Sequence, residues 1–136
     1  MTIVVDVSVA AAWYLADEEN RAADDVAGRL TAERAVVPSL FRHELRNVLL
    51  TAFRRGRLSQ EEYFDNVVQA ERLPLVDCGG GDALRIAELA VRRRLTAYNA
   101  AYLSLAIEER AELATFDAAL AAAARLEQVK VIGAAP

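Results

Sequence analysis

Short runs of apolar, β-branched residues alternate along the chain with longer stretches whose apolar residues recur at helical spacing. The first run, residues 3–5, is apolar at every position, as expected for a strand that is buried on both faces. Four further runs are expected to form short strands, at 35–37, 74–76, 112–115 and 129–132. Strands separated by helices in this way predict an α/β fold with a mainly parallel sheet.

The stretches between these runs carry the start signals of helices. Pro38 and Ser39 precede a long helix, Ser59 and Glu62 have the spacing of a capping box, and Asp82 is a suitable N-cap. The expected helices cover 8–16 with Ser8 as cap, 20–33, 40–52, 60–71, 83–93, 97–109 and a segment from 118 onward. No repeat or low-complexity linker interrupts the pattern. We therefore expect one domain over 1–136, a three-layer α/β/α sandwich around a short, mainly parallel central sheet.

Charge and composition limit the function. The 136 residues carry 20 acidic and 16 basic side chains, which gives a formal net charge of -4. This balance excludes a protein that coats nucleic acid through overall positive charge. Lys130 is the single lysine, so nearly all the positive charge is arginine, whose guanidinium suits bidentate contact with phosphate or carboxylate. A hydrophobic content of 54% supports a self-sufficient core and excludes disorder.

The single cysteine and the N-terminal segment indicate the compartment. Cys78 has no partner for an intramolecular disulfide, and no thiol cluster has the spacing of metal ligands. The apolar stretch at 3–16 is interrupted by Asp6 and Ser8 and is too short to span a bilayer. We therefore expect a cytoplasmic protein that does not associate with a membrane.

Three carboxylates stand where a site is expected. Asp6 and Asp117 each follow a predicted strand, at the sheet edge where ligands of parallel sheets collect. Glu44 has apolar neighbours one helical turn before and after it, which point its side chain inward. Two carboxylates about 4 Å apart repel by roughly 4 kcal/mol at an effective dielectric of 20, so such a cluster requires protons or a cation.

The available ligand types favour Mg²⁺, or alternatively Mn²⁺, over zinc. Hard dications prefer carboxylate and water oxygens, and the chain offers one cysteine and one histidine. Such an ion activates water and binds a phosphate oxygen. The acidic cluster therefore indicates phosphodiester hydrolysis.

Four segments resemble, in order and spacing, the PIN-domain ribonuclease toxins of the VapC family: VVDVSVAAAW, PSLFRHELRNVL, LTAYNAAYLSLA and LATFDAALAAAA. The resemblance covers essentially the whole chain. It implies a PIN-like fold whose acidic site, catalytic and metal-binding, falls on Asp6, Glu44, Asn99 and Asp117. Ser8 and Thr115 match the family's small hydroxyl positions beside the metal.

The same resemblance implies a biological role. It implies a Mg²⁺-dependent endoribonuclease, the toxin of a type II toxin-antitoxin system, that cleaves structured RNA and inhibits translation. Its expected partners are the RNA substrate, a second copy in a homodimer, and a small antitoxin whose C-terminal segment lies along the toxin's helices and blocks the site.

Position 99 departs from the family pattern, which carries aspartate there. Asn99 keeps the shape of aspartate without its charge, and its amide oxygen is a weaker Mg²⁺ ligand. We therefore expect this chain to be nearly inactive. Asn99 is either natural to an attenuated member or an isosteric change that disarms a toxic enzyme, and the close match of its flanking residues favours the second.

Two other functions remain open. A degenerate PIN fold that only binds RNA or an antitoxin would also explain Asn99. Phosphoryl transfer to an aspartate, as in haloacid-dehalogenase phosphatases or receiver domains, is less well supported, because Ser8 stands where a phosphatase carries a second acid and Lys130 is the only lysine.

Contact with RNA requires local positive charge. Arginines are dense at 42–57 and at 92–94, and Arg42 and Arg46 are the preferred RNA-binding candidates because they flank Glu44 on its helix.

Three other features of the sequence are explained by structure and not by function. His43 is expected to lie on the surface or in packing contacts, and the glycines at 79–81 form a turn because the lysine of a phosphate loop is missing. The tyrosines at 98 and 102 are expected to face the core or a subunit interface.

Overall fold

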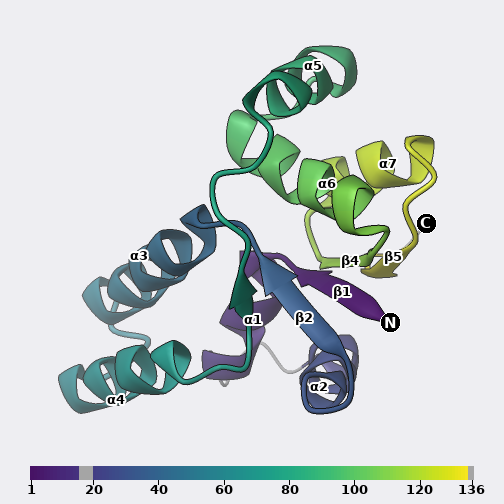
Figure 1. The fold of residues 1–136 in the computed structure, drawn as a ribbon. Coiled ribbons are helices and arrows are strands. Elements are labelled where there is room, and N and C mark those ends of the chain that lie inside the picture. Colours follow the sequence, from purple (N-terminus) through teal and green to yellow (C-terminus); the bar gives the residue numbers. More distant parts are fainter. Residues whose placement is uncertain (16–19, 135–136) are drawn as a thin grey trace.

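The computed structural model describes residues 1–15 and 20–134 of the chain (Figure 1). Its centre is a five-stranded sheet in the order β3-β2-β1-β4-β5, in which every neighbouring pair is parallel. The strands are β1 Thr2–Val5, β2 Arg34–Val37, β3 Val76–Asp77, β4 Glu112–Thr115 and β5 Val131–Gly133. The predicted parallel sheet is confirmed.

Seven helices in the described residues connect these strands. They are α1 Val7–Tyr14, α2 Arg21–Arg29, α3 Leu40–Arg54, α4 Gln60–Glu71, α5 Ala83–Arg93, α6 Ala97–Glu109 and α7 Ala118–Leu126. Helices α1–α4 connect the strands from β1 toward the β3 edge of the sheet, and α5–α7 connect them in the opposite direction toward β5. Because such crossovers are right-handed, helices α1–α4 lie on one face of the sheet and helices α5–α7 on the other (Figure 1). This arrangement is the expected three-layer α/β/α sandwich. None of these helices combines the length and apolar character needed to cross a membrane.

The direction of the strand order reverses between β1 and β4. The carboxyl ends of these two central strands therefore leave a crevice from which the chain departs to both faces. Asp6 follows β1 and Asp117 follows the end of β4, so both acids lie at this crevice. The strands that place them are fixed by the core, in which Ile3, Val4 and Val5 are fully buried.

Two strands begin later than the pattern predicts. Pro74 has no backbone N–H, and the amide of Leu75 donates to Leu73 at 2.8 Å, so pairing of β3 starts only at Val76. Before β5, the amide of Val129 donates to Ala124 and closes the end of α7, so the strand starts at Val131.

Helix starts are predicted better than helix ends. The capping box of Ser59 and Glu62 and the Asp82 cap are both present. The second helix ends at Arg29, four residues before the predicted end. Ser8 is not a cap, because α1 already begins at Val7 and the Ser8 hydroxyl donates to Asp6 instead. The predicted end of this helix at position 16 lies outside the described residues.

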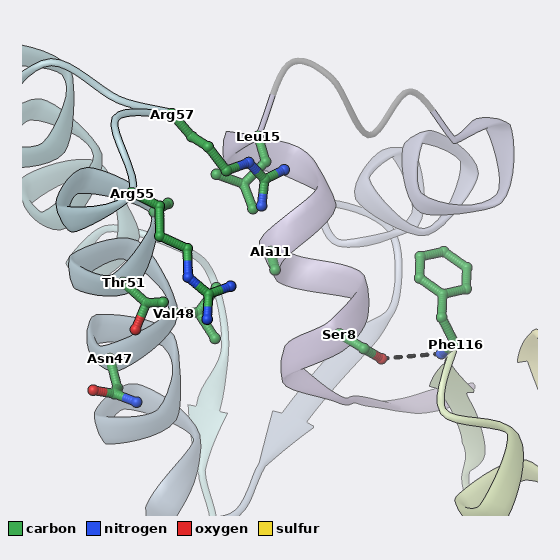
Figure 2. A pocket seen from close by; sticks show the side chains of 10 residues that line it. Ser8, Ala11, Leu15, Asn47, Val48, Thr51, Arg55, Arg57 and Phe116 are labelled. Atoms are coloured by element: carbon green, nitrogen blue, oxygen red, sulfur yellow. Dashed lines mark hydrogen bonds between the residues drawn. The ribbon is translucent and has the colours of Figure 1, made fainter.

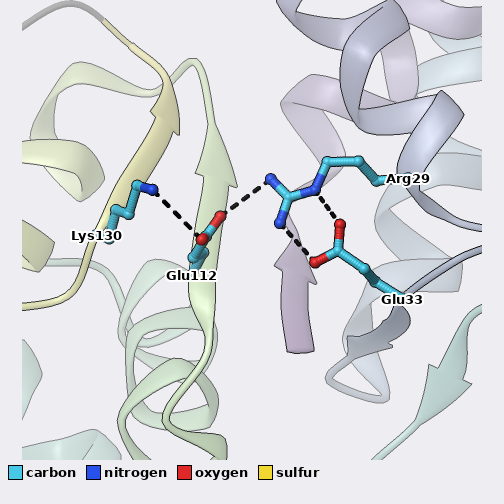
Figure 3. Close-up of polar contacts among 4 residues, drawn as sticks. All are labelled: Arg29, Glu33, Glu112 and Lys130. Atoms are coloured by element: carbon cyan, nitrogen blue, oxygen red, sulfur yellow. Dashed lines mark hydrogen bonds and ion pairs between the residues drawn. The ribbon is translucent and has the colours of Figure 1, made fainter. Parts of the chain in front are cut away.

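A cluster of ion pairs closes the opposite, amino-terminal edge of the sheet (Figure 3). Arg29 contacts Glu33 one turn later in the chain, and its Nη1 lies 3.0 Å from Oε2 of Glu112, the first residue of β4. Lys130 Nζ lies 3.5 Å from the other oxygen of Glu112. The Glu112 side chain is only 12% exposed, so these cations compensate a carboxylate that is largely removed from water.

Replacing Arg29 with methionine tests the importance of this cluster. We expect Arg29→Met to lower the free energy of unfolding by about 1–2 kcal/mol, because Glu112 loses its closest cation while it stays mostly buried. The measurement is urea denaturation followed by circular dichroism. Arg46→Met is the matched control, since its ion pair with Glu71 is exposed on both sides and its loss is expected to change little. Equal effects of the two substitutions would contradict this interpretation.

Candidate active site

Asp6 is a buried carboxylate at the end of the central strand β1. It is 3% exposed, and its Oδ2 accepts hydrogen bonds from Ser8 Oγ at 2.5 Å and from Thr115 Oγ1 at 2.8 Å. Burial raises the pKa of Asp6, while the two hydroxyl donors oppose that rise. The local sequence produces this geometry because strand β1 ends at Val5 and helix α1 begins at Val7, which leaves Asp6 at the turn.

The same two hydroxyls also hold the loop after β4. The amide of Phe116 donates to Ser8 Oγ at 3.0 Å, and the amide of Asp117 donates to Thr115 Oγ1 at 3.0 Å. Each hydroxyl thus donates a hydrogen bond to Asp6 and accepts one from a backbone N–H of the loop after β4. We call Asp6, Ser8 and Thr115 with these two amides the hydroxyl bridge. It fixes the position of Asp117 relative to Asp6.

Asn99 and Asp117 meet at the ends of two helices. Asp117 is the N-cap of α7, where its Oδ1 accepts from the amide of Leu120 at 2.9 Å. Asn99 lies in the first turn of α6, which Thr96 caps through the Asn99 amide. The side-chain Nδ2 of Asn99 lies 3.4 Å from Oδ2 of Asp117. The amide therefore contacts a carboxylate that an aspartate at position 99 would repel.

Glu44 reaches the site from α3 on the opposite face of the sheet. Its Oε1 accepts a 2.6 Å hydrogen bond from the hydroxyl of Tyr102 in α6, which is fully buried. Burial raises the pKa of Glu44, the Tyr102 hydrogen bond opposes the rise, and the Asp6 carboxylate adds to it. The pKa of Tyr102 is also raised, chiefly by burial and then by Glu44, so the phenol stays a proton donor. The effect of the Asp6 carboxylate on Glu44 indicates that Glu44 lies within electrostatic range of Asp6.

The donor set has the chemistry of a site for a hard dication. Asp6, Glu44, Asn99 and Asp117 offer carboxylate and amide oxygens, and a cation would offset the cost of keeping buried Asp6 and half-buried Glu44 charged. Among residues 1–15 and 20–134, no three histidine, cysteine or acidic side chains lie close enough to form a metal-binding group by themselves.

Arg42 and Arg46, which are predicted to bind RNA, both contact helix α4. Arg42 Nη1 donates to the carbonyl of Ala70 at 3.1 Å, and Arg46 pairs with Glu71. Both residues lie two positions from Glu44, about 200° around the helix, so they face away from it. The structure thus does not bring them together with the acids, and their role in RNA binding stays a prediction.

Two arginines of the segment 92–94 also form ion pairs within the protein. Arg92 and Arg93 both pair with Glu127, which follows α7. These contacts join α5 to the residue that follows α7.

A cavity of about 400 Å³ lies between α1 and α3, next to the hydroxyl bridge (Figure 2). Ser8 and Phe116 form its wall at the acidic site, and Arg55 and Arg57 lie at its far end. The remaining lining residues are Ala11, Leu15, Asn47, Val48, Thr51 and Ala52. Another hollow contains Glu44 and Asn47 together with Leu40, His43 and Tyr98.

Sequence reasoning overlooked Tyr102 as a contact of Glu44. It is buried, as expected, but its hydroxyl holds a site residue; its position one turn after Asn99 was the available signal. Tyr98, by contrast, is 65% exposed. Arg55 and Arg57 belong to the arginine-dense segment 42–57, but helical spacing does not predict where they lie because α3 ends at Arg54.

The raised pKa of Glu44 predicts a pH-dependent effect of Glu44→Gln. A carboxyl whose folded pKa is raised stabilises the fold fully below its ordinary value of 4.5, and this contribution is lost as the pH rises through the folded pKa. In chelator, unfolding measurements from pH 4 upward should therefore show Glu44→Gln becoming progressively more stable relative to the parent chain. A difference that does not depend on pH would contradict the burial argument. Asp77→Asn, at the exposed strand β3, is the control.

Gly133 supports the loop that carries Asp117, which predicts a cost for Gly133→Ala. At its φ of +109°, an added Cβ would lie 2.8 Å from the Phe116 ring and 2.8 Å from the Thr115 carbonyl oxygen. We expect a loss of about 1–3 kcal/mol in the free energy of unfolding, measured by denaturation. Gly28→Ala is the matched control, because Gly28 is helical with open space around it, and alanine there should stabilise. Similar effects at both positions would refute this role for Gly133.

Solved structures share this fold. PAE2754 from Pyrobaculum aerophilum superposes with a TM-score of 0.73 at 22% identity, over 96% of this chain and 83% of that one. VapBC2 from Rickettsia felis, bound to a DNA fragment from its promoter, gives 0.66 at 14% identity over 96% and 97% of the two chains. FitAcB from Neisseria gonorrhoeae gives 0.66 at 18% identity, over 96% of each chain.

Sequence comparisons give the family. A search of curated proteins finds no match. The family model of the PIN domain matches residues 3–126, a span that runs from strand β1 to the end of α7 and contains all four residues of the candidate site. The expectation of a PIN fold is confirmed, and the chain belongs to the PIN domain family.

Proposed function

We propose that this chain, a single PIN domain over 1–136, is a Mg²⁺-dependent endoribonuclease attenuated by Asn99. PIN domains are generally nucleases that use divalent metal ions. The observation that carries the proposal is the convergence of Asp6, Glu44, Asn99 and Asp117 at the carboxyl edge of the sheet, joined by the hydroxyl bridge and by Tyr102. Oxygen ligands around a crevice suit Mg²⁺, and Mn²⁺ is a chemically similar substitute.

In this proposal the four residues of the site have different roles. Asp6, Asn99 and Asp117 would hold the ion through oxygen atoms, with Glu44 beside them. When bound, the ion supplies Lewis-acid polarisation of the phosphate and lowers the pKa of water. Glu44 positions the attacking water and takes up its proton at Oε2, the oxygen opposite the one that Tyr102 engages. Ser8 and Thr115 keep Asp6 oriented through their hydrogen bonds to Oδ2.

The biological role follows from the resemblance to VapC toxins and from the neighbours VapBC2 and FitAcB. We infer a type II toxin that cleaves structured RNA, inhibits translation and is restrained by a small antitoxin. A cytoplasmic location and a homodimer belong to the same proposal. The alternative is a degenerate PIN fold that binds RNA or antitoxin without cleavage, and it is supported by the contact of Asn99 with Asp117, which needs no cation.

Restoring aspartate at position 99 tests the proposal. We expect Asn99→Asp to raise the rate of RNA cleavage in Mg²⁺ by about 10- to 100-fold, the scale on which groups that support a metal change affinity or activity. Cleavage is measured on total cellular RNA by mapping new 5′ ends, with chelator in a parallel reaction. Inducible expression should at the same time arrest growth.

Two controls separate the possible functions. The double variant Asp6→Asn with Asn99→Asp should stay inactive, because it restores one charge and removes another. In chelator, Asn99→Asp should melt at a lower temperature than the parent chain, since two carboxylates then meet, and Mg²⁺ should reverse the loss. An Asn99→Asp protein that binds RNA without new cleavage would support the binding module and reject the nuclease.

A further inference from the structure

The cavity between α1 and α3 continues the acidic site along one stripe of α3. Glu44, Asn47, Thr51 and Arg55 are spaced by three, four and four residues, so their side chains lie on the same face of the helix. Asn47 lines both the hollow that contains Glu44 and the cavity that ends at Arg55. From Glu44 to Arg55 the helix advances about 16 Å. A polar track therefore leads from the candidate active site to a pair of guanidinium groups.

The charge of this cavity is opposite to that of the active site. Among the described residues that line it, Arg55 and Arg57 carry the only charges, and both are positive (Figure 2). Its floor is apolar where Ala11, Leu15 and Val48 meet, and Asn47 and Thr51 add hydrogen-bonding groups. A volume of about 400 Å³ lies within the range of small-ligand sites. Guanidinium groups beside an apolar floor suit a phosphate joined to a sugar and a base.

We propose that this cavity is a nucleotide subsite for the RNA substrate, in which Arg55 and Arg57 each bind a backbone phosphate away from the scissile one. Asn47 and Thr51 hydrogen-bond to the nucleotides between the scissile phosphate and the phosphates at the arginines. The inference rests on the proposed nuclease function and assigns substrate contacts to the two residues of the arginine-dense segment 42–57 that line the cavity.

Continuity with the acidic site favours RNA over a protein segment as the occupant. Ser8 and Phe116 form the cavity wall, and the same pair carries the hydrogen bond that belongs to the hydroxyl bridge. A strand whose scissile phosphate lies at Asp6 thus enters the cavity with its next nucleotide. The arginines also offset the repulsion that Asp6 and Glu44 exert on a polyanion.

Binding of RNA to the Asn99 chain tests the subsite without cleavage. The probe is a fluorescein-labelled RNA hairpin with an unpaired loop, titrated by fluorescence anisotropy at several salt concentrations. We expect Arg55→Ala with Arg57→Ala to weaken binding about tenfold or more, and to reduce the slope of log affinity against log salt by about 1.4, for two phosphate contacts at about 0.7 each. Arg55→Ala alone should remove about half of that slope.

The matched control removes the same charge from exposed positions outside the cavity. Arg54→Ala with Arg72→Ala should leave the salt slope unchanged. Equal losses of salt slope in both double variants would show that overall charge causes the effect, and this would overturn the subsite. An unchanged slope in the cavity variant would also overturn it. Equal competition by a polyglutamate peptide of similar charge would likewise overturn it and indicate a protein ligand. Thermal melts establish that each variant is folded.

Cleavage assays in the Asn99→Asp background separate this inference from the proposed function. The cavity variant should raise KM while kcat changes little, because the arginines bind the substrate away from the reacting atoms. Cleavage with an unchanged KM would reject the subsite and leave the nuclease standing. An inactive Asn99→Asp protein whose RNA binding still depends on Arg55 and Arg57 would reject the nuclease and retain the binding site.

Discussion

The buried carboxylate of Asp6 is the constraint on which the rest of the site depends. A side chain that is 3% exposed at the end of a central strand must find hydrogen-bond donors, and it finds them in Ser8 and Thr115. Those donors in turn accept backbone amides from the loop after β4, so satisfying one carboxylate positions Asp117 on the neighbouring strand. The site is therefore organised by the need to keep Asp6 satisfied inside the fold.

Asn99 changes the electrostatics of this arrangement more than its shape. With an amide at position 99, Asp117 has a neutral neighbour whose N–H contacts its carboxylate, so this pair lacks the repulsion that two carboxylates would have. Glu44 joins the cluster from α3 through a buried phenol of α6. The crevice thus links the helical layers on both faces of the sheet, and the charge at one position sets how strongly it requires a counterion.

Strand β1, the parallel sheet and the acids at strand ends follow directly from the sequence, because continuous apolar runs and caps are local signals. The sequence predicts that the Ser8 hydroxyl caps a helix. In the structure it donates a hydrogen bond to the buried Asp6 carboxylate instead, because α1 already begins at Val7. Arg42 is predicted from the sequence to contact RNA, and in the structure its guanidinium donates to the carbonyl of Ala70 in α4. Where a long side chain ends depends on helix packing, which periodicity does not specify.

Asp117 serves at once as the cap of α7 and as a member of the acidic cluster. Its Oδ1 is committed to the Leu120 amide, so only Oδ2 faces Asn99. An ion bound through both oxygens of Asp117 would compete with the Leu120 amide for Oδ1. Ion binding of that kind would therefore be coupled to the stability of the first turn of α7.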